Sequence, residues 1–148
     1  MTGNGEQEEA TDRAGADDTT IVRVMVAIGI NPNTERLLLR AARLAKGLHG
    51  RLYAIHIQPP NAASHVYQAN VEWHLQQARR LGAQVEIIRA DDIADTLVQA
   101  GRRHRITHLV LGQSDISRWQ EALRGSIVNR ILRYRSGIDI YIVTDPQQ

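Results

Sequence analysis

The chain reads IVRVMVAI over residues 21–28, a short and nearly continuous run of apolar, mostly β-branched side chains. Such runs are typical of strands that are buried on both faces of a parallel sheet. A helix is predicted directly after the run, because Asn31 can cap its first turn, Pro32 suits its first position and Gly50 can end it. Its apolar residues recur with helical spacing at Leu37, Leu38, Ala41, Leu44, Ala45 and Leu48.

The same strand-then-helix pattern repeats along the rest of the chain. Further strands are predicted at residues 51–57, 84–89, 107–111 and 138–143. Helices are predicted at about 63–81, after a cap at Asp91, and at 126–134, whereas residues 112–125 are interpreted as a linker. Five strands alternating with four helices indicate an α/β domain, with helices on both faces of a parallel sheet.

This fold class predicts where a ligand would bind. In doubly wound sheets the ligand site lies beyond the carboxyl ends of the strands, where the strand order reverses. If the first strand is central and the fourth strand is its neighbour, the crevice lies between Gly29 and Gly112.

Composition excludes several classes of protein. The 148 residues suffice for one domain. Hydrophobic residues make up 43% of the chain and charged residues 23%, and both fractions are close to the average of globular proteins. We expect no membrane insertion, because no apolar run approaches the roughly 18 residues of a membrane span. The chain has no cysteine, which excludes disulfides, thiol catalysis and Cys-ligated zinc. A cytoplasmic location is therefore expected.

Charge divides the chain into two parts. Residues 1–19 contain six acidic residues and one arginine and lack apolar periodicity, so we expect a disordered acidic tail. The domain, residues 20–148, is correspondingly basic, and all but one of its basic residues are arginines. Arginine is a planar bidentate donor, so this bias favours phosphate-bearing partners. A general preference for arginine on solvated faces explains it equally well.

The segment from the fourth strand to the last helix carries the main motif. Gly112 lets the backbone leave the strand sharply, and Gly125-Ser126 opens a helix whose free N–H groups can bind phosphate. Arg118 and Arg124 add positive charge. An ordinary turn and helix cap is the alternative interpretation.

This segment resembles the universal stress protein superfamily. Its nucleotide-binding members carry Gly-x2-Gly-x9-Gly-[Ser/Thr] after the fourth strand, and Gly112, Asp115 and Gly125-Ser126 fall at this spacing. The resemblance covers about residues 20–144. The closer resemblance is to the universal-stress-type domain of KdpD potassium-sensor histidine kinases, so the chain is at most a stand-alone relative or an excised domain. It is carried by the Gly-x-Ser opening at residues 112–114, Arg118-Trp119, residues 123–126 with the apolar helix after them, and residues 40–45.

Two positions depart from the pattern of the superfamily. Asp115 replaces the second glycine, and its carboxylate would repel a polyphosphate unless an arginine pairs with it. The superfamily's aspartate after the first strand is replaced by Gly29-Ile30-Asn31, of which Asn31 can still hydrogen-bond a sugar hydroxyl. Both changes disfavour a triphosphate with magnesium.

Other kinds of site are less well supported. Among the six histidines no metal-ligand spacing occurs, and only His56, near the end of the second strand, is kept as a candidate ligand contact. No aromatic residue interleaves with the basic residues 102–105, so no nucleic-acid site is expected. No nucleophile elbow, Walker lysine or catalytic carboxylate pair is visible.

The resemblance implies a flavodoxin-like five-stranded parallel sheet in the order 3-2-1-4-5. It also implies a non-catalytic regulatory module that binds an adenine nucleotide (AMP, ATP or cyclic di-AMP), with no certain cofactor. We expect the base near Ile57, the phosphates on Gly125-Ser126, and signalling as a homodimer joined through residues 138–143, an apolar strand at the end of the sheet. The candidate nucleotide-binding residues are Gly29, Ile30, Asn31, His56, Ile57, Gly112, Gln113, Ser114, Arg118, Arg124, Gly125, Ser126 and Ile127.

Two rival interpretations remain open. One is a ligand-free dimeric adaptor that binds a regulatory protein, with purely structural glycines. The other is a slow ATPase or nucleotidyl transferase, against which the absence of a Walker lysine and of a general base counts.

Overall fold

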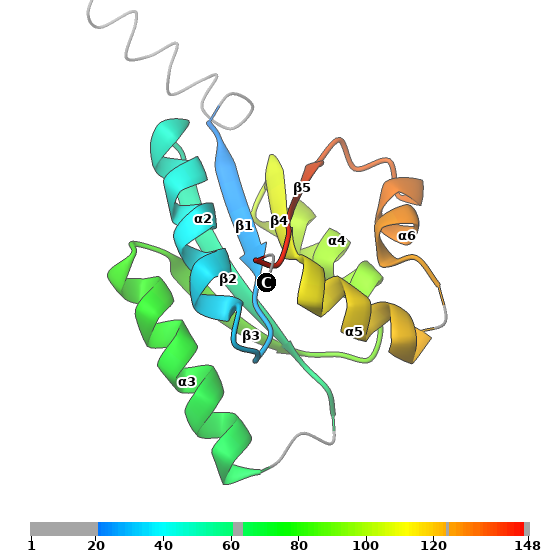
Figure 1. Ribbon diagram of the computed structural model, residues 1–148. Coiled ribbons are helices and arrows are strands. Elements are labelled where there is room, and N and C mark those ends of the chain that lie inside the picture. The colour runs from blue at the N-terminus through cyan, green and yellow to red at the C-terminus, as the bar shows by residue number, and fades with distance from the viewer. Residues whose placement is uncertain (1–20, 61–63, 124, 147–148) are drawn as a thin grey trace, which may run out of the picture.

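The five strands form one parallel sheet in the order β3-β2-β1-β4-β5, which confirms the order implied by the resemblance (Figure 1). The computed structural model describes residues 21–60, 64–123 and 125–146, so the predicted acidic tail lies outside the described residues. The strands are β1 (Arg23–Ala27), β2 (Arg51–Gln58), β3 (Gln84–Arg89), β4 (His108–Gly112) and β5 (Asp139–Val143).

Helices cover both faces of the sheet (Figure 1). One face packs against α2 (Thr34–Gly47) and α3 (His65–Arg80). The other face packs against α4 (Ile93–Arg103), α5 (Gln113–Leu123) and α6 (Ile127–Arg133). All five residues of β1 are buried, as expected of a central strand with a core on either side.

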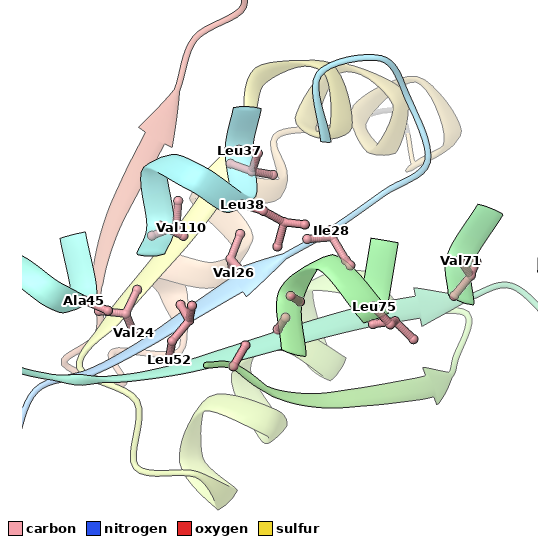
Figure 2. Close-up of a cluster of buried hydrophobic side chains, with 14 residues drawn as sticks. Val24, Val26, Ile28, Leu37, Leu38, Ala45, Leu52, Val71, Leu75 and Val110 are labelled. Atoms are coloured by element: carbon pink, nitrogen blue, oxygen red, sulfur yellow. The ribbon is translucent and has the colours of Figure 1, made fainter. Parts of the chain in front are cut away.

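Alternation along β1 divides the core into two clusters. Val24 and Val26 point toward α2 and α3, where Leu38 and Leu75 complete the first cluster (Figure 2). The intervening Met25 and Ala27 point to the opposite face and pack with residues of α4 and α6. This two-sided burial holds β1 between β2 and β4 and places Gly29 beside the end of β4.

The predicted linker 112–125 is wrong over most of its length, because α5 occupies Gln113–Leu123. The described residues therefore contain five helices after β1, where the sequence predicted four. Most residues of this segment are polar. However, Ile116 is buried and Trp119 packs against the second core cluster, and their spacing of three is that of one helical face.

Three predicted helix ends differ in the structure. The cap of α2 is Asn33 rather than Asn31, and Asn31 instead accepts a hydrogen bond from the Asn33 N–H in the preceding turn (2.8 Å). Gly50 does not end this helix, which stops at Gly47, with His49 in the left-handed region. The cap of α4 is Asp92 rather than Asp91, and its carboxylate accepts from the Asp95 N–H.

None of the helices within the described ranges has both the length and the apolarity that a membrane crossing requires.

Candidate functional site

The candidate site lies at the carboxyl ends of β1 and β4, the central strands between which the strand order reverses. Gly29 follows β1, Gly112 is the last residue of β4, and the first turn of α5 comes directly after it. This is the place where doubly wound sheets bind ligands. The sheet therefore brings the two predicted glycines together.

The side chain of Asp115 fills the space between these glycines. It is only 2% exposed, and its Oδ1 lies 2.0 Å from the position that a Cβ on Gly29 would occupy. Its Oδ2 lies 3.1 Å from the corresponding position on Gly112. Glycine is needed at 29 because any side chain there would overlap the carboxylate.

Nitrogen donors surround the Asp115 carboxylate. The Asn31 side-chain amide donates to Oδ1 (2.9 Å), and the backbone N–H of Gly29 also donates to the carboxylate. Burial raises the pKa of Asp115 to about 6, although the Arg118 cation and these hydrogen bonds oppose the shift. Asp115, which replaces the second glycine of the family motif, thus accepts hydrogen bonds from the loop after β1.

A second network closes the mouth of the crevice. Asn33 donates to Ser114 Oγ (3.1 Å) and to Asp145 Oδ1 (3.0 Å), and the Ser114 hydroxyl donates to the same Asp145 oxygen (2.8 Å). The side chain of Gln113 accepts from the backbone N–H of Asp145 (2.8 Å). Together these bonds leave a cavity of only about 10 Å³, room for about one water molecule.

His56 has a partner on each ring nitrogen. Nδ1 lies 2.7 Å from the Ile28 carbonyl oxygen, so it carries the proton, and Nε2 accepts from the Tyr67 hydroxyl (2.5 Å). Burial lowers the pKa of His56, which favours this neutral form. In this state the side chain ties β2 to the end of β1 and to α3.

Arg118 and the isoleucines lie around the same end of the sheet. The Arg118 guanidinium is exposed and donates to the Ile30 carbonyl oxygen (3.2 Å). Ile30 packs against the α2–α3 core, whereas Ile57 packs against the core on the opposite face. Arg118 is therefore a cation at the edge of the crevice that retains donors for a further anion.

The helix α5 separates the last part of the motif from the crevice (Figure 1). Its 11 residues span about 16 Å at 1.5 Å per residue, and Gly125 and Ser126 follow its far end. The Ser126 hydroxyl accepts from the Asn129 N–H (3.1 Å) and so caps α6, while Ile127 is fully buried. Arg124 lies outside the described residues.

Sequence reasoning did not foresee the contribution of Asn33 and Asp145. Asn33 lies in the turn before α2, and Asp145 follows β5, so the pair is separated by 112 positions. The signal that could have found them is their place after β1 and after β5, at the same edge of a parallel sheet. Within the described ranges, no group of three histidine, aspartate or glutamate side chains forms a set of metal ligands.

Comparison with known proteins identifies the family. The model of the universal stress protein family matches residues 20–143, and the chain belongs to this family. It is 32% identical over 128 residues to the putative sensor protein KdpD of Synechocystis sp., covering 83% of this chain and 34% of that protein. It is 31% identical over 124 residues to the sensor protein KdpD of Mycobacterium tuberculosis, covering 84% of this chain and 14% of that protein. The chain thus spans about a third or less of these relatives.

Solved structures share the fold. A universal stress protein in complex with cAMP superimposes with a TM-score of 0.64 at 22% identity, covering 85% of this chain and 98% of that one. The universal stress protein of Archaeoglobus fulgidus in complex with dAMP gives a TM-score of 0.58 at 15% identity, covering 82% and 96%. These likenesses show the flavodoxin-like fold of the family.

Proposed function

We propose that this domain is a non-catalytic regulatory module that binds an adenine nucleotide of low charge in the crevice between β1 and β4. Two structural neighbours are complexes with cAMP and dAMP, each of which carries a single phosphate. The proposal also accommodates cyclic di-AMP, in which each phosphate carries one negative charge. ATP is the least suitable member of the class, because its triphosphate would meet Asp115.

One observation carries the proposal: a carboxylate already occupies the crevice between Gly29 and Gly112 and accepts hydrogen bonds there. The Gly29 N–H and the Asn31 amide are therefore arranged around an anionic oxygen, and Arg118 adds a cation beside them. A ligand phosphate would take over these donors when the first turn of α5 moves the Asp115 side chain aside. Asp115 then acts as a competitor for the ligand.

The other candidate residues take their roles from their positions. Ile57 and His56 lie at the end of β2, on the side where we place the adenine base. Gln113 and Ser114 would have to release Asp145 for the phosphate to enter. The structure supports a phosphate position near Gly29 and Arg118 more directly than one on Gly125-Ser126, since the Ser126 hydroxyl already caps α6.

Calorimetry with AMP, cAMP, cyclic di-AMP and ATP tests this proposal. We expect wild type to bind the first three at least as well as ATP, and Asp115→Gly to strengthen ATP binding most. Arg118→Gln should weaken binding by about tenfold or more, the effect of one lost charged hydrogen bond. Asp91→Gly, which removes an exposed acid from a loop, is the control. No heat with any nucleotide, in wild type or in Asp115→Gly, would refute nucleotide binding.

The filled crevice favours a second function, that of a ligand-free adaptor. In this case Asp115 is a permanent part of the core, and the domain acts only through its surfaces. A panel without binding in wild type or in Asp115→Gly supports this alternative.

Both functions include a homodimer formed through β5, which is an edge of the described sheet (Figure 1). Tyr141 and Ile142 are 42% and 49% exposed on this strand, and an apolar edge of this kind pairs readily with a second copy. Ile140 packs into the core, so its replacement would damage the fold. Ile142→Lys should halve the mass seen in light scattering, whereas Leu132→Lys, an exposed control on α6, should not. An unchanged mass in Ile142→Lys would place the interface elsewhere.

A further inference from the structure

A large groove lies at the opposite end of the sheet from the nucleotide crevice. It has a volume of about 810 Å³ and is bounded by the last turns of α2 and α3 and the first residues of β2. Leu39, Leu52 and Leu81 contribute apolar lining. Helices α2 and α3 lie side by side on this face (Figure 1). The groove is thus separate from the site proposed above.

Four cationic side chains line this groove: Arg43, Lys46, Arg51 and Arg80. The described residues that line the groove include no aspartate or glutamate. Within the described part of the chain, none of the four side chains has a hydrogen-bond or ion-pair partner. The cations therefore form an uncompensated positive patch, which we call the basic groove.

Some basic residues elsewhere on the domain are paired with acids. Arg79 forms a salt bridge with Glu72 (3.0 Å), and Arg130 forms one with Asp92 (2.7 Å). Lys46 and Arg80 complement the negative ends of α2 and α3, but Arg51 begins a strand and has no such role. Helix dipoles alone therefore do not account for four cations around one groove.

The acidic segment of the chain is attached at the edge of this groove. Residues 6–18 contain three glutamates and three aspartates against one arginine. They lead into Val22, whose carbonyl oxygen accepts from the Arg51 N–H (2.9 Å). A Cβ on Gly50, another lining residue, would lie 2.6 Å from the same oxygen. The chain thus enters the domain beside the groove.

The short connection makes an intramolecular contact favourable. Asp18 is four residues from Val22, and an extended chain covers at most about 14 Å over that length. A tethered segment of this kind has an effective concentration in the millimolar range. The opposite charges of segment and groove supply the attraction.

We propose that the basic groove binds the acidic segment of its own chain, residues 6–18. The contact is electrostatic and agrees with a segment that has little apolar surface to bury. While it persists, the segment shields the four cations from external polyanions. This inference goes beyond the proposed function, because it concerns a different face of the domain and does not require nucleotide binding.

Paramagnetic relaxation enhancement on the full chain tests the proposal. The protein has no cysteine, so Thr11→Cys gives a single attachment point for a nitroxide label. We expect broadening of the backbone amides of residues 43–51 and 80–84 at about 0.1 M salt. The broadening should fall at about 1 M salt, where the screening length drops from about 10 Å to about 3 Å.

Two triple variants of the labelled protein decide whether the groove is the docking site. Arg43→Gln with Arg51→Gln and Arg80→Gln should abolish the broadening. The matched control is Arg40→Gln with Arg89→Gln and Arg133→Gln, which removes the same charge from exposed positions outside the groove. This control variant should keep the broadening. The proposal is overturned if wild type shows no broadening at the groove, or if both triple variants behave alike. Broadening between labelled and unlabelled molecules in a mixture would equally overturn an intramolecular contact.

Discussion

The two ends of the sheet differ in how their polar groups are satisfied. At the carboxyl end, the Asp115 carboxylate and the Asn33–Ser114–Asp145 network leave a cavity of about 10 Å³. At the amino end, four cations surround about 810 Å³ without described partners. The first part of the family motif, Gly112 and Asp115, thus lies where the chain's own side chains fill the crevice, whereas open volume and unpaired charge lie where no motif residue is found. The first end should therefore control stability, and the second should control association.

The largest expected effect is the pH dependence that Asp115 imposes on folding. Its pKa is raised from 3.8 to about 6 by burial, so the folded protein keeps a proton that the unfolded chain has already released. Stability should therefore fall as the pH rises from about 4 to about 6, and a shift of this size corresponds to about 3 kcal/mol. Urea unfolding at a series of pH values measures the effect.

Asp115→Asn isolates this contribution from those of other titrating groups. The variant keeps a side chain of similar shape but cannot ionise, so it should lose the decline between pH 4 and pH 6. If the stabilities of wild type and Asp115→Asn change in parallel across this range, burial does not raise the pKa of Asp115.

The next effect concerns the close approach of Gly29 to Asp115. Gly29→Ala would place a Cβ 2.0 Å from Oδ1, and we expect it to cost about 2–3 kcal/mol of unfolding free energy. In an Asp115→Gly background the same substitution should cost little, because the conflicting atoms are gone. The double-mutant cycle measures this coupling directly. Additive effects would show that Asp115 does not occupy the space beside Gly29.

The sequence predicted the strands well, because burial determines them, whereas the order of the strands followed from the resemblance to the family. Residues 21–28 are mostly apolar on both faces, a pattern typical of a central strand in a parallel sheet, and β1 is buried along its whole length. The last helix was also predicted, because Ser126 is a strong capping residue. These features depend on local patterns of a few residues.

The parts that the sequence did not predict depend on contacts between distant segments. The helix α5 is polar along most of its length and is fixed by the packing of Ile116 and Trp119. The burial of Asp115 depends on donors 84 and 86 positions earlier, at Asn31 and Gly29, which no local pattern reveals. Gly50 was noticed as a helix end, whereas its actual role is to let Val22 approach.

Two glycines at the amino end of the sheet, Gly47 and Gly50, differ in the space around them. Gly50→Ala should cost about 1–2 kcal/mol, because its Cβ would meet the Val22 carbonyl oxygen at 2.6 Å. A Cβ on Gly47, at the end of α2, would meet no atom within 4 Å, so Gly47→Ala should stabilise the protein by about 0.5–1 kcal/mol. Thermal unfolding of both variants tests the difference. Equal midpoints would mean that the close contact of Val22 with Gly50 contributes nothing to stability.

The smallest expected effect is that of the groove cations on stability. Arg43 and Arg80 are exposed and without described partners, so Arg43→Gln and Arg80→Gln should each change the unfolding free energy by no more than about 0.5 kcal/mol. Removing one of several like charges should make the change slightly stabilising at low salt, and screening should erase it at high salt. Arg130→Gln, which breaks a salt bridge to the Asp92 cap, should instead destabilise. Urea unfolding at two salt concentrations compares the three variants. A loss of more than about 1 kcal/mol of unfolding free energy in either groove variant would show that these cations stabilise the fold and do not serve association alone.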